Sequence, residues 1–190
     1  MTKKIFRDKS WADFHRAHVA RATADVKRLP RHLFSDPSLA GRLDRIVVQH
    51  TAKIATLGAP TGGKARAEGE VTDDYGSRRY VEKKLVDVTI PFTGSAESFG
   101  LSASNCHMMA ANYDMRGQAL VLTLPDDEGL SDAVEDFIRR ATHNLDLIRA
   151  EMKQAEPELK QAVYAAAERM KQEIAAEGAR DAKVNFKIER

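Results

Sequence analysis

The chain has 190 residues, of which 43 % are hydrophobic and 31 % are charged. This composition excludes a disordered acidic tail and a collagen-like fibre. A membrane span is also excluded, because no apolar run approaches the roughly 20 residues that a span requires. The single cysteine, Cys106, excludes an internal disulfide framework, and the first eight residues lack the apolar stretch of a secretory signal. We therefore expect one cytoplasmic domain over residues 1–190, with no membrane association.

Charge is divided unevenly along the chain. Residues 1–66 contain 14 Lys and Arg against 5 Asp and Glu, whereas residues 67–190 contain 16 against 23. Such a dipole can steer a polyanion toward the basic part, or basic helices can pack on acidic surfaces within the molecule or between copies. The sequence leaves both alternatives open. A third alternative is that the uneven charges lie on solvated surfaces and take part in no binding.

Apolar residues spaced by three and four predict a helical hairpin over residues 10–57. The first helix is expected at 10–29, where Pro30 stops it. The second is expected at 39–57, where Gly58 closes it.

The apolar pattern then alternates, which predicts a mostly antiparallel central sheet in the region 66–124. Strands are expected at 68–71 and 81–90, joined by a turn at 73–77. A further strand at 118–124 has the short apolar run typical of a central position. One short strand near 99–103 should divide the long stretch between them.

Two C-terminal helices are expected within residues 131–177. Ser131 should cap the first, and Pro157 should separate it from the second, because the residue before a proline avoids helical angles. The alternating residues 184–188 predict a possible final edge strand. The elements together predict an α+β fold.

The stretch Gly58–Lys64 has the spacing of a phosphate-binding loop, in which backbone amides surround the phosphates. Ala65 stands where a magnesium-binding Ser or Thr is needed, and Pro60 lacks an amide hydrogen. A phosphate loop also leaves a strand and enters a helix, whereas helical periodicity precedes this one. We therefore interpret the stretch as a flexible connector.

The segment 92–117 contains a possible pocket made of Cys106, His107, Asp114 and Arg116. An imidazole can activate a thiol, but adjacent side chains of an extended segment point to opposite sides. A packed thiol is the more economical interpretation of Cys106. We expect no catalytic residue, metal or cofactor, although an enzyme with its site in 92–117 stays open as an alternative.

Histidines and acids of other segments have simpler explanations. His18 and His50 fall within apolar stripes, where histidines are usually hydrogen-bonded at the margin of a core. His15 and His18 share a helical face, but no third ligand follows at a recognised interval. The acidic turn 126–128 is expected to be solvated or, as the second choice, to dock on the basic helices.

A second candidate site is a nucleic-acid surface on the basic N-terminal helices. Phosphate contacts would make binding depend steeply on salt, but no aromatic interleaving or zinc-finger spacing accompanies the charges. The candidate residues are Arg16, Arg21, Lys27, Arg28, Arg42 and Arg45.

The stretch Val86–Gly94, followed by Phe99, resembles uncharacterised bacterial proteins that place an Ile-Pro-Phe-x-Gly strand between helical ends. The resemblance covers this strand, the next strand and the long helix after it. It implies a bacterial origin and an accessory role in a multi-gene system, and it supplies no catalytic residue.

The leading hypothesis is a non-enzymatic interaction module that self-associates or joins a complex through its helices. It depends on the amphipathic helices, on the possible edge strand and on the lack of a catalytic constellation that fits its context. We therefore expect a protein partner or a homo-oligomer, with nucleic acid as a possible alternative partner.

Overall fold

The computed structural model describes residues 3–74, 77–106 and 112–181, which divide into two compact units. The first unit comprises the N-terminal stretch up to Trp11 together with Lys53–Glu151. The second comprises Ala12–Ala52 together with the chain from Met152 onward. Helices and a sheet both contribute, so the expected α+β class is confirmed.

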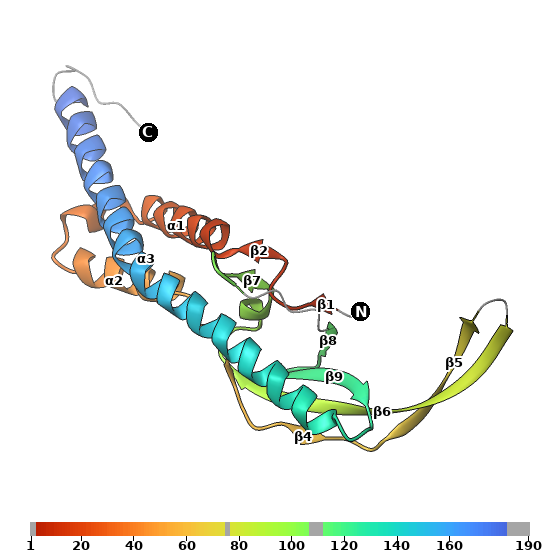
Figure 1. Ribbon diagram of the computed structural model, residues 1–190. Helices are drawn as coiled ribbons and strands as arrows, with labels where there is room; N and C mark the ends of the chain where they lie inside the picture. The colour runs from red at the N-terminus through yellow and green to blue at the C-terminus, as the bar shows by residue number, and fades with distance from the viewer. Residues whose placement is uncertain (1–2, 75–76, 107–111, 182–190) are drawn as a thin grey trace. The chain divides into compact units, whose positions relative to one another are not determined.

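The long strand β6 (Ser77–Thr93) organises the sheet of the first unit (Figure 1). Seven strands of the described chain form this sheet, and every pairing in it is antiparallel. Along one side of β6 lie β3 (Thr56–Leu57), β4 (Thr61–Gly62) and β5 (Arg66–Asp74). On the other side lie β9 (Ala119–Pro125), then β8 (Asn112–Met115) and β1 (Lys3–Lys4). A separate parallel pair joins β2 (Lys9–Ser10) to β7 (Leu101–Ser102).

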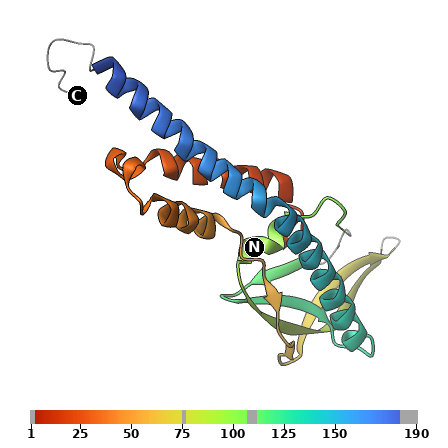
Figure 2. The same cartoon turned by 90° about the vertical axis from the view of Figure 1, so that its left-hand side faces the viewer.

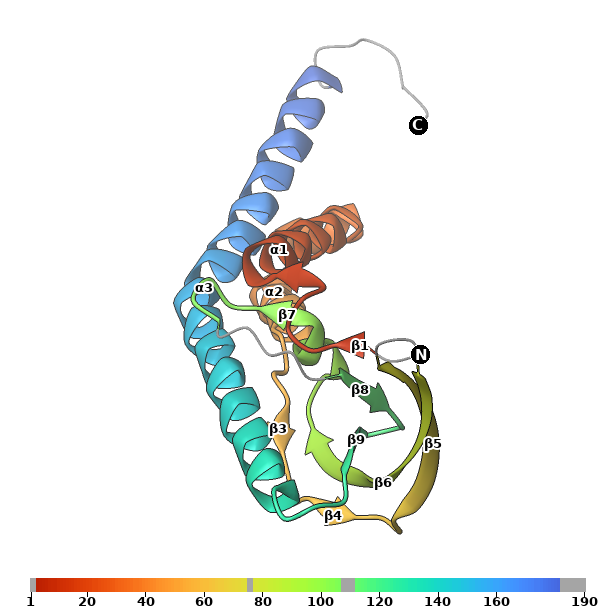
Figure 3. The same cartoon turned by 45° about the vertical axis from the view of Figure 1, so that its right-hand side comes forward.

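The core of the first unit lies between this sheet and the first part of helix α3 (Leu130–Asp181), which runs alongside the strands in Figure 3. Alternate residues of β6 and a continuous run of β9 are buried, as is one face of the helix. Phe99, at 0 % exposure, is the centre of an aromatic cluster. Its ring lies 4.9 Å from that of Phe92 in an edge-to-face arrangement, and 6.4 Å from that of Tyr113.

The second unit is helical (Figure 2). It contains α1 (Trp11–Lys27) apart from its first residue, the short 3-10 helix η1 (Arg31–Ser35), α2 (Leu39–His50) and the last part of α3. Apolar faces of all of them meet in one core that includes Val26, Phe34, Leu43, Val47 and Val163. Among the described residues, no helix is both long enough and apolar enough to cross a membrane.

The second predicted helix, 39–57, was too long. α2 ends at His50, and Thr51 turns to an extended conformation while its hydroxyl donates to the Val47 carbonyl (2.8 Å). Residues Thr56–Leu57 then pair with β6. The apolar side chains that continued the helical pattern, such as Leu57, belong instead to a strand.

The stretch 58–63 is part of the sheet rather than a flexible connector. The amide hydrogens of Gly58 and Gly63 donate to the carbonyls of Pro91 (2.7 Å) and Asp87 (2.8 Å). These amides are therefore used in pairing and do not surround a phosphate. A strand precedes Gly58, contrary to expectation, but β5 rather than a helix follows, so the order required of a phosphate loop is still not met.

The two expected C-terminal helices are one continuous helix, α3, with Pro157 inside it. A proline within a helix costs about 3 kcal/mol. Beyond Pro157, Leu159 and Val163 are buried in the core of the second unit, and each such burial contributes about 2 kcal/mol. Burial of the continuing apolar face therefore outweighs the break that the proline favours.

The start of α3 also differs from the expectation. The helix begins at Leu130, and Ser131 is inside it rather than at its cap. The Asp127 carboxylate accepts a hydrogen bond from Gly129 N–H (2.9 Å) and its carbonyl accepts one from Leu130 N–H (3.2 Å). The acidic turn thus begins the helix.

The strands expected at 68–71 and 81–90 were right in place but too short, the one expected at 118–124 corresponds to β9, and the one expected near 99–103 was too long. The strand expected at 81–90 is β6, and the one at 68–71 is β5. The short strand near 99–103 is β7, preceded by the 3-10 helix η2 (Ala96–Gly100). The expected edge strand at 184–188 lies outside the described residues. Sequence reasoning missed β1, β2 and β8, which are too short to show a pattern.

Candidate functional site

Three of the pocket residues predicted in segment 92–117, namely Cys106, Asp114 and Arg116, are among the described residues of the first unit. Cys106 follows β7, is half-buried, and its N–H donates to the Ala103 carbonyl (3.2 Å). Asp114 lies in β8 opposite Val121. His107 lies outside the described residues. The pocket stays a prediction, because only part of it is described.

Arg116, the fourth of these residues, joins a polar cluster around Asp87 of β6. The Asp87 carboxylate accepts a hydrogen bond from the Thr123 hydroxyl (2.7 Å) and pairs with Arg66 Nη1 (2.8 Å) and Arg116 Nη2 (3.6 Å). The Thr123 hydrogen bond, followed by the two guanidinium groups, lowers the pKa of Asp87 below its ordinary value. This cluster links β5, β6 and β9, and the Asp87 carboxylate is fully engaged in these structural contacts.

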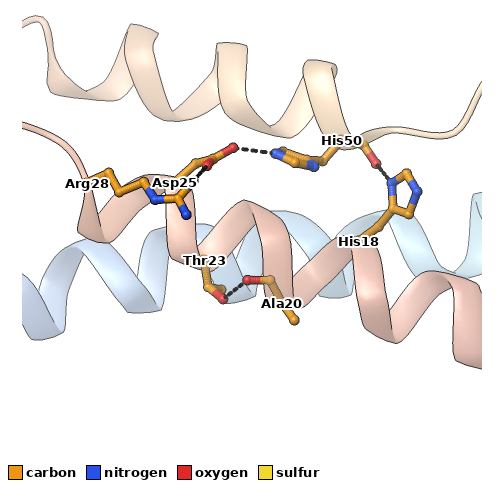
Figure 4. Close-up of polar contacts among 6 residues, drawn as sticks. All are labelled: His18, Ala20, Thr23, Asp25, Arg28 and His50. Atoms are coloured by element: carbon orange, nitrogen blue, oxygen red, sulfur yellow. Dashed lines mark hydrogen bonds and ion pairs between the residues drawn. The ribbon is translucent and has the colours of Figure 1, made fainter.

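A connected group of polar side chains in the second unit joins α1 to α2 (Figure 4). His50 Nε2 donates to Asp25 Oδ2 (2.8 Å), since a carboxylate can only accept. His18 Nδ1 donates to the His50 carbonyl (3.0 Å). Arg28 Nη1 lies 3.2 Å from Asp25 Oδ1. The expectation that His18 and His50 are hydrogen-bonded at the margin of a core is confirmed.

An aspartate–histidine pair can act as a general base when a hydroxyl or thiol lies beside it. The neighbouring Thr23 hydroxyl donates to the Ala20 carbonyl (3.0 Å) and is already used (Figure 4). His18 instead satisfies a carbonyl at the C-terminal end of α2, where helices leave their last carbonyls unpaired. The group therefore caps the C-terminal end of α2 and links α2 to α1.

Metal binding finds no support in the described part of the chain. No group of three or more His, Cys, Asp or Glu side chains there is placed to hold an ion. Of the two histidines that share a face of α1, His18 bonds to the main chain and His15 Nε2 lies 3.4 Å from Glu158 Oε2.

The candidate nucleic-acid residues of α1 and α2 are all exposed, but several are engaged. Arg16 pairs with Asp13, and Arg45 Nε donates to the Gly41 carbonyl (3.3 Å). Arg28 pairs with Asp25 as described above. Arg21, Lys27 and Arg42 remain exposed on the two helices. The positive charge of this surface is accordingly reduced by its own carboxylates.

A feature that the sequence did not disclose is the outer half of β6. β5 pairs with it at nine successive positions, from Arg66 opposite Leu85 to Asp74 opposite Ser77. β9, on the other side, ends with Pro125 opposite Leu85. No other strand of the described chain pairs with β6 beyond that point, so β5 and β6 continue as a two-stranded ribbon, which Figure 1 shows extending past the end of β9.

Hydrogen bonds nearer the centre of the sheet show which edge each β6 residue faces. Phe92 N–H donates to the Gln118 carbonyl (2.9 Å), and the Lys84 carbonyl accepts from Asp126 N–H (2.9 Å), so even-numbered residues face β9. The odd-numbered Asp87 and Pro91 face the opposite side, as their bonds to the glycines of 58–63 show.

The same alternation applies to the ribbon, because the register with β5 runs without a bulge. Backbone N–H and C=O groups of the odd-numbered residues of β6 therefore face β5. Those of Arg78, Tyr80 and Glu82 face away from β5, on the side that β9 no longer covers. We call these three residues the open edge of β6.

The two ribbon strands carry opposite charge. Residues 66–74 of β5 contain four Asp and Glu and one Arg, whereas residues 77–84 of β6 contain four Lys and Arg and one Glu. Glu68 of β5 lies opposite Lys83 of β6 in this register, and such an opposite-charge pair stabilises the ribbon. The open edge consequently belongs to a basic strand.

Comparison with protein-family models, with curated proteins and with solved structures finds no match to this chain. The resemblance of Val86–Gly94 to bacterial proteins therefore stays a prediction.

Proposed function

We propose that the chain is a non-enzymatic protein-interaction module of a larger complex, and that the β5–β6 ribbon is its docking element. The observation that carries this proposal is that β6 continues from Lys84 to Ser77 with β5 as its one strand neighbour in the described chain. A lone two-stranded hairpin is marginally stable in water, because it has no hydrophobic face to bury. A partner strand along the ribbon would add the third strand that such a hairpin needs for independent stability.

The helices, which the sequence suggested as the docking surface, are less suited to this task. The apolar faces of α1, α2 and the last part of α3 are used in the core of their own unit. Among the described residues, the large exposed hydrophobic side chain is Val48, at 70 % exposure. A single exposed apolar residue is ordinary on a protein surface and does not mark an interface.

The test is site-specific cross-linking in the cells from which the chain originates. A photoreactive residue replacing Thr72 of the ribbon should give a cross-linked product with another protein. The same residue replacing Glu135, which is exposed on α3 of the same unit, is the matched control. Cross-linking at Glu135 but none at Thr72 would contradict the assignment of the ribbon as docking element.

Nucleic-acid binding by α1 and α2 is the second proposal, favoured by the exposure of Arg21, Lys27 and Arg42. Retention on heparin should fall on changing Arg21 and Lys27 to Glu, because each lost phosphate contact weakens salt-dependent binding. Unchanged retention would exclude this surface.

The setting of the module belongs to the same proposal. The lone cysteine supports a cytoplasmic location, and the Ile-Pro-Phe-x-Gly segment supports a bacterial origin. The polar and apolar contacts between α1 and α2 support the predicted N-terminal helical hairpin as a structural support.

A further inference from the structure

We infer that the open edge of β6 accepts an acidic extended segment of a partner protein as an added antiparallel strand. This inference rests on the proposed function and names the chemistry of the partner. The added strand would occupy, beside the ribbon, the place that β9 occupies beside the inner half of β6.

The backbone provides the binding groups. Arg78, Tyr80 and Glu82 each direct one N–H and one C=O toward the side of β6 along which no further strand of the described chain runs, as the alternation of bonds on either side of Lys84 requires. Unpaired groups in a row are the template on which an extended peptide adds to a sheet. Asp126 N–H, bonded to the Lys84 carbonyl, already begins such a row.

Charge selects among the possible strands. Residues 77–84 carry four Lys and Arg and one Glu, so an acidic segment is attracted and a basic one is repelled. The same charge prevents the open edge of a second copy from pairing with this one, because two basic strands would lie side by side.

A second copy of the chain could present its acidic β5 to the open edge instead, but that pairing does not produce a closed assembly. The outer edge of β5 and the open edge of β6 are different surfaces of one ribbon, so joining them head to tail would produce an open-ended assembly. An acidic segment of another protein ends the addition after one strand, and we therefore choose it as the occupant.

The experiment measures binding of the full chain to a fluorescent acidic decapeptide in which Glu alternates with Val. A peptide of the same sequence with N-methyl groups on alternate amides keeps the charge but cannot pair along a strand. We expect the plain peptide to bind at least ten times more tightly than the methylated one. Equal binding would overturn the inference, since charge alone would then account for it.

Two proline variants locate the edge. Tyr80→Pro removes an N–H from the open edge while leaving the bonds to β5, and Val71→Pro removes an outward N–H from β5, opposite Tyr80. We expect the first to weaken peptide binding at least tenfold and the second to leave it unchanged. The reverse result would overturn the inference by assigning binding to β5.

Amide exchange along the ribbon serves as the control that each variant keeps its β5–β6 pairing. If a variant loses this pairing, Glu82→Pro takes the place of Tyr80→Pro, and Gly69→Pro takes the place of Val71→Pro, because these are the next residues with outward-facing amides. Light scattering tests the alternative that a second copy of the chain occupies the open edge. Self-association that Tyr80→Pro abolishes would overturn the inference in favour of that alternative. Cross-linking at Thr72 without peptide binding would retain the docking function and reject the acidic partner.

Discussion

The carboxylate of Asp25 connects the end of α2 to α1 by accepting a hydrogen bond from His50 Nε2 (2.8 Å). That bond is the main cause of the lowered pKa of Asp25, and the nearby Arg28 lowers it further. A lowered folded-state pKa stabilises the protein above the unfolded value, near 3.8, and this stabilisation is lost as the pH falls through the folded pKa.

Asp25→Asn should therefore lower the free energy of unfolding by about 1 kcal/mol at pH 7, because a charge-assisted hydrogen bond is lost. The difference from wild type should shrink as the pH falls below 3.8. Thermal unfolding from pH 7 to pH 2.5 measures it. Glu173→Gln, a change to an exposed residue of α3, is the control and should have little effect. A difference that stays constant with pH would contradict the assigned role of the Asp25 charge.

Ser98 is a second residue whose role is local and testable. It is 1 % exposed, and its hydroxyl accepts a hydrogen bond from Ala55 N–H (3.0 Å), which holds the chain just before β3. Ser98→Ala should cost about 1–3 kcal/mol in chemical denaturation, because a buried N–H is left without an acceptor. Ser102→Ala, at a less buried serine that donates to the Lys9 carbonyl, should cost less. Equal costs would show that water replaces the Ser98 hydroxyl.

At the scale of elements, the turn after β6 depends on a glycine. Gly94 has a φ of +89°, and a Cβ built there would lie 2.8 Å from the Ile54 carbonyl oxygen. Gly117 also has a positive φ, +59°, but has open space around it. Comparing alanine at the two positions separates backbone strain from steric conflict.

Gly94→Ala should destabilise the first unit by about 2–4 kcal/mol, because both strain and overlap with a carbonyl are introduced. Gly117→Ala should cost about 1 kcal/mol, since strain is its one penalty. Denaturation midpoints of the two variants provide the measurement. A Gly117 variant as unstable as the Gly94 variant would rule out the close approach as the cause.

Pro157 is the residue at which local preference and tertiary packing disagree. Pro157→Ala should raise the stability of the second unit by about 1–3 kcal/mol, because it restores an N–H to the helix and removes a ring that clashes with the preceding turn. Glu156→Ala, next to it and exposed, is the control. Loss of stability in the proline variant would mean that α3 is adapted to a bend at this point.

Periodicity was enough to locate most long elements. The stripes that include Leu43, Phe137 and Val163 are buried as expected, because an amphipathic helix shows its buried face in the sequence. The end of α2 and the continuity of α3 could not be obtained this way. Leu57 fits a helix and a strand equally well, and the effect of Pro157 depends on what the following turns pack against.

The candidate site was predictable only in part. Placing His18 and His50 on apolar stripes correctly indicated hydrogen-bonded histidines, but their acceptors come from the other helix and from the main chain. The open edge of β6 gave no sequence signal, since it arises because β9 ends before β6 does. The opposite charges of residues 66–74 and 77–84 were a signal that could have marked the ribbon.

At the scale of the whole molecule, the two units differ in which groups they leave for binding. The helical unit uses its apolar faces for its own core, and the sheet unit ends in a ribbon whose backbone groups are not all paired within the described chain. Docking through main-chain groups requires a strand of defined direction and charge but few apolar contacts. An interaction module with this surface would select extended segments rather than folded faces.

The central claim, that β6 has an open edge, is tested most directly by amide hydrogen exchange of the full chain, residue by residue along the ribbon. Amides of Arg79 and Val81, which face β5, should exchange slowly, whereas those of Arg78, Tyr80 and Glu82 should exchange rapidly and become protected when a partner strand binds. Equal protection of both sets in the isolated chain would contradict the account, because the edge would then already be covered.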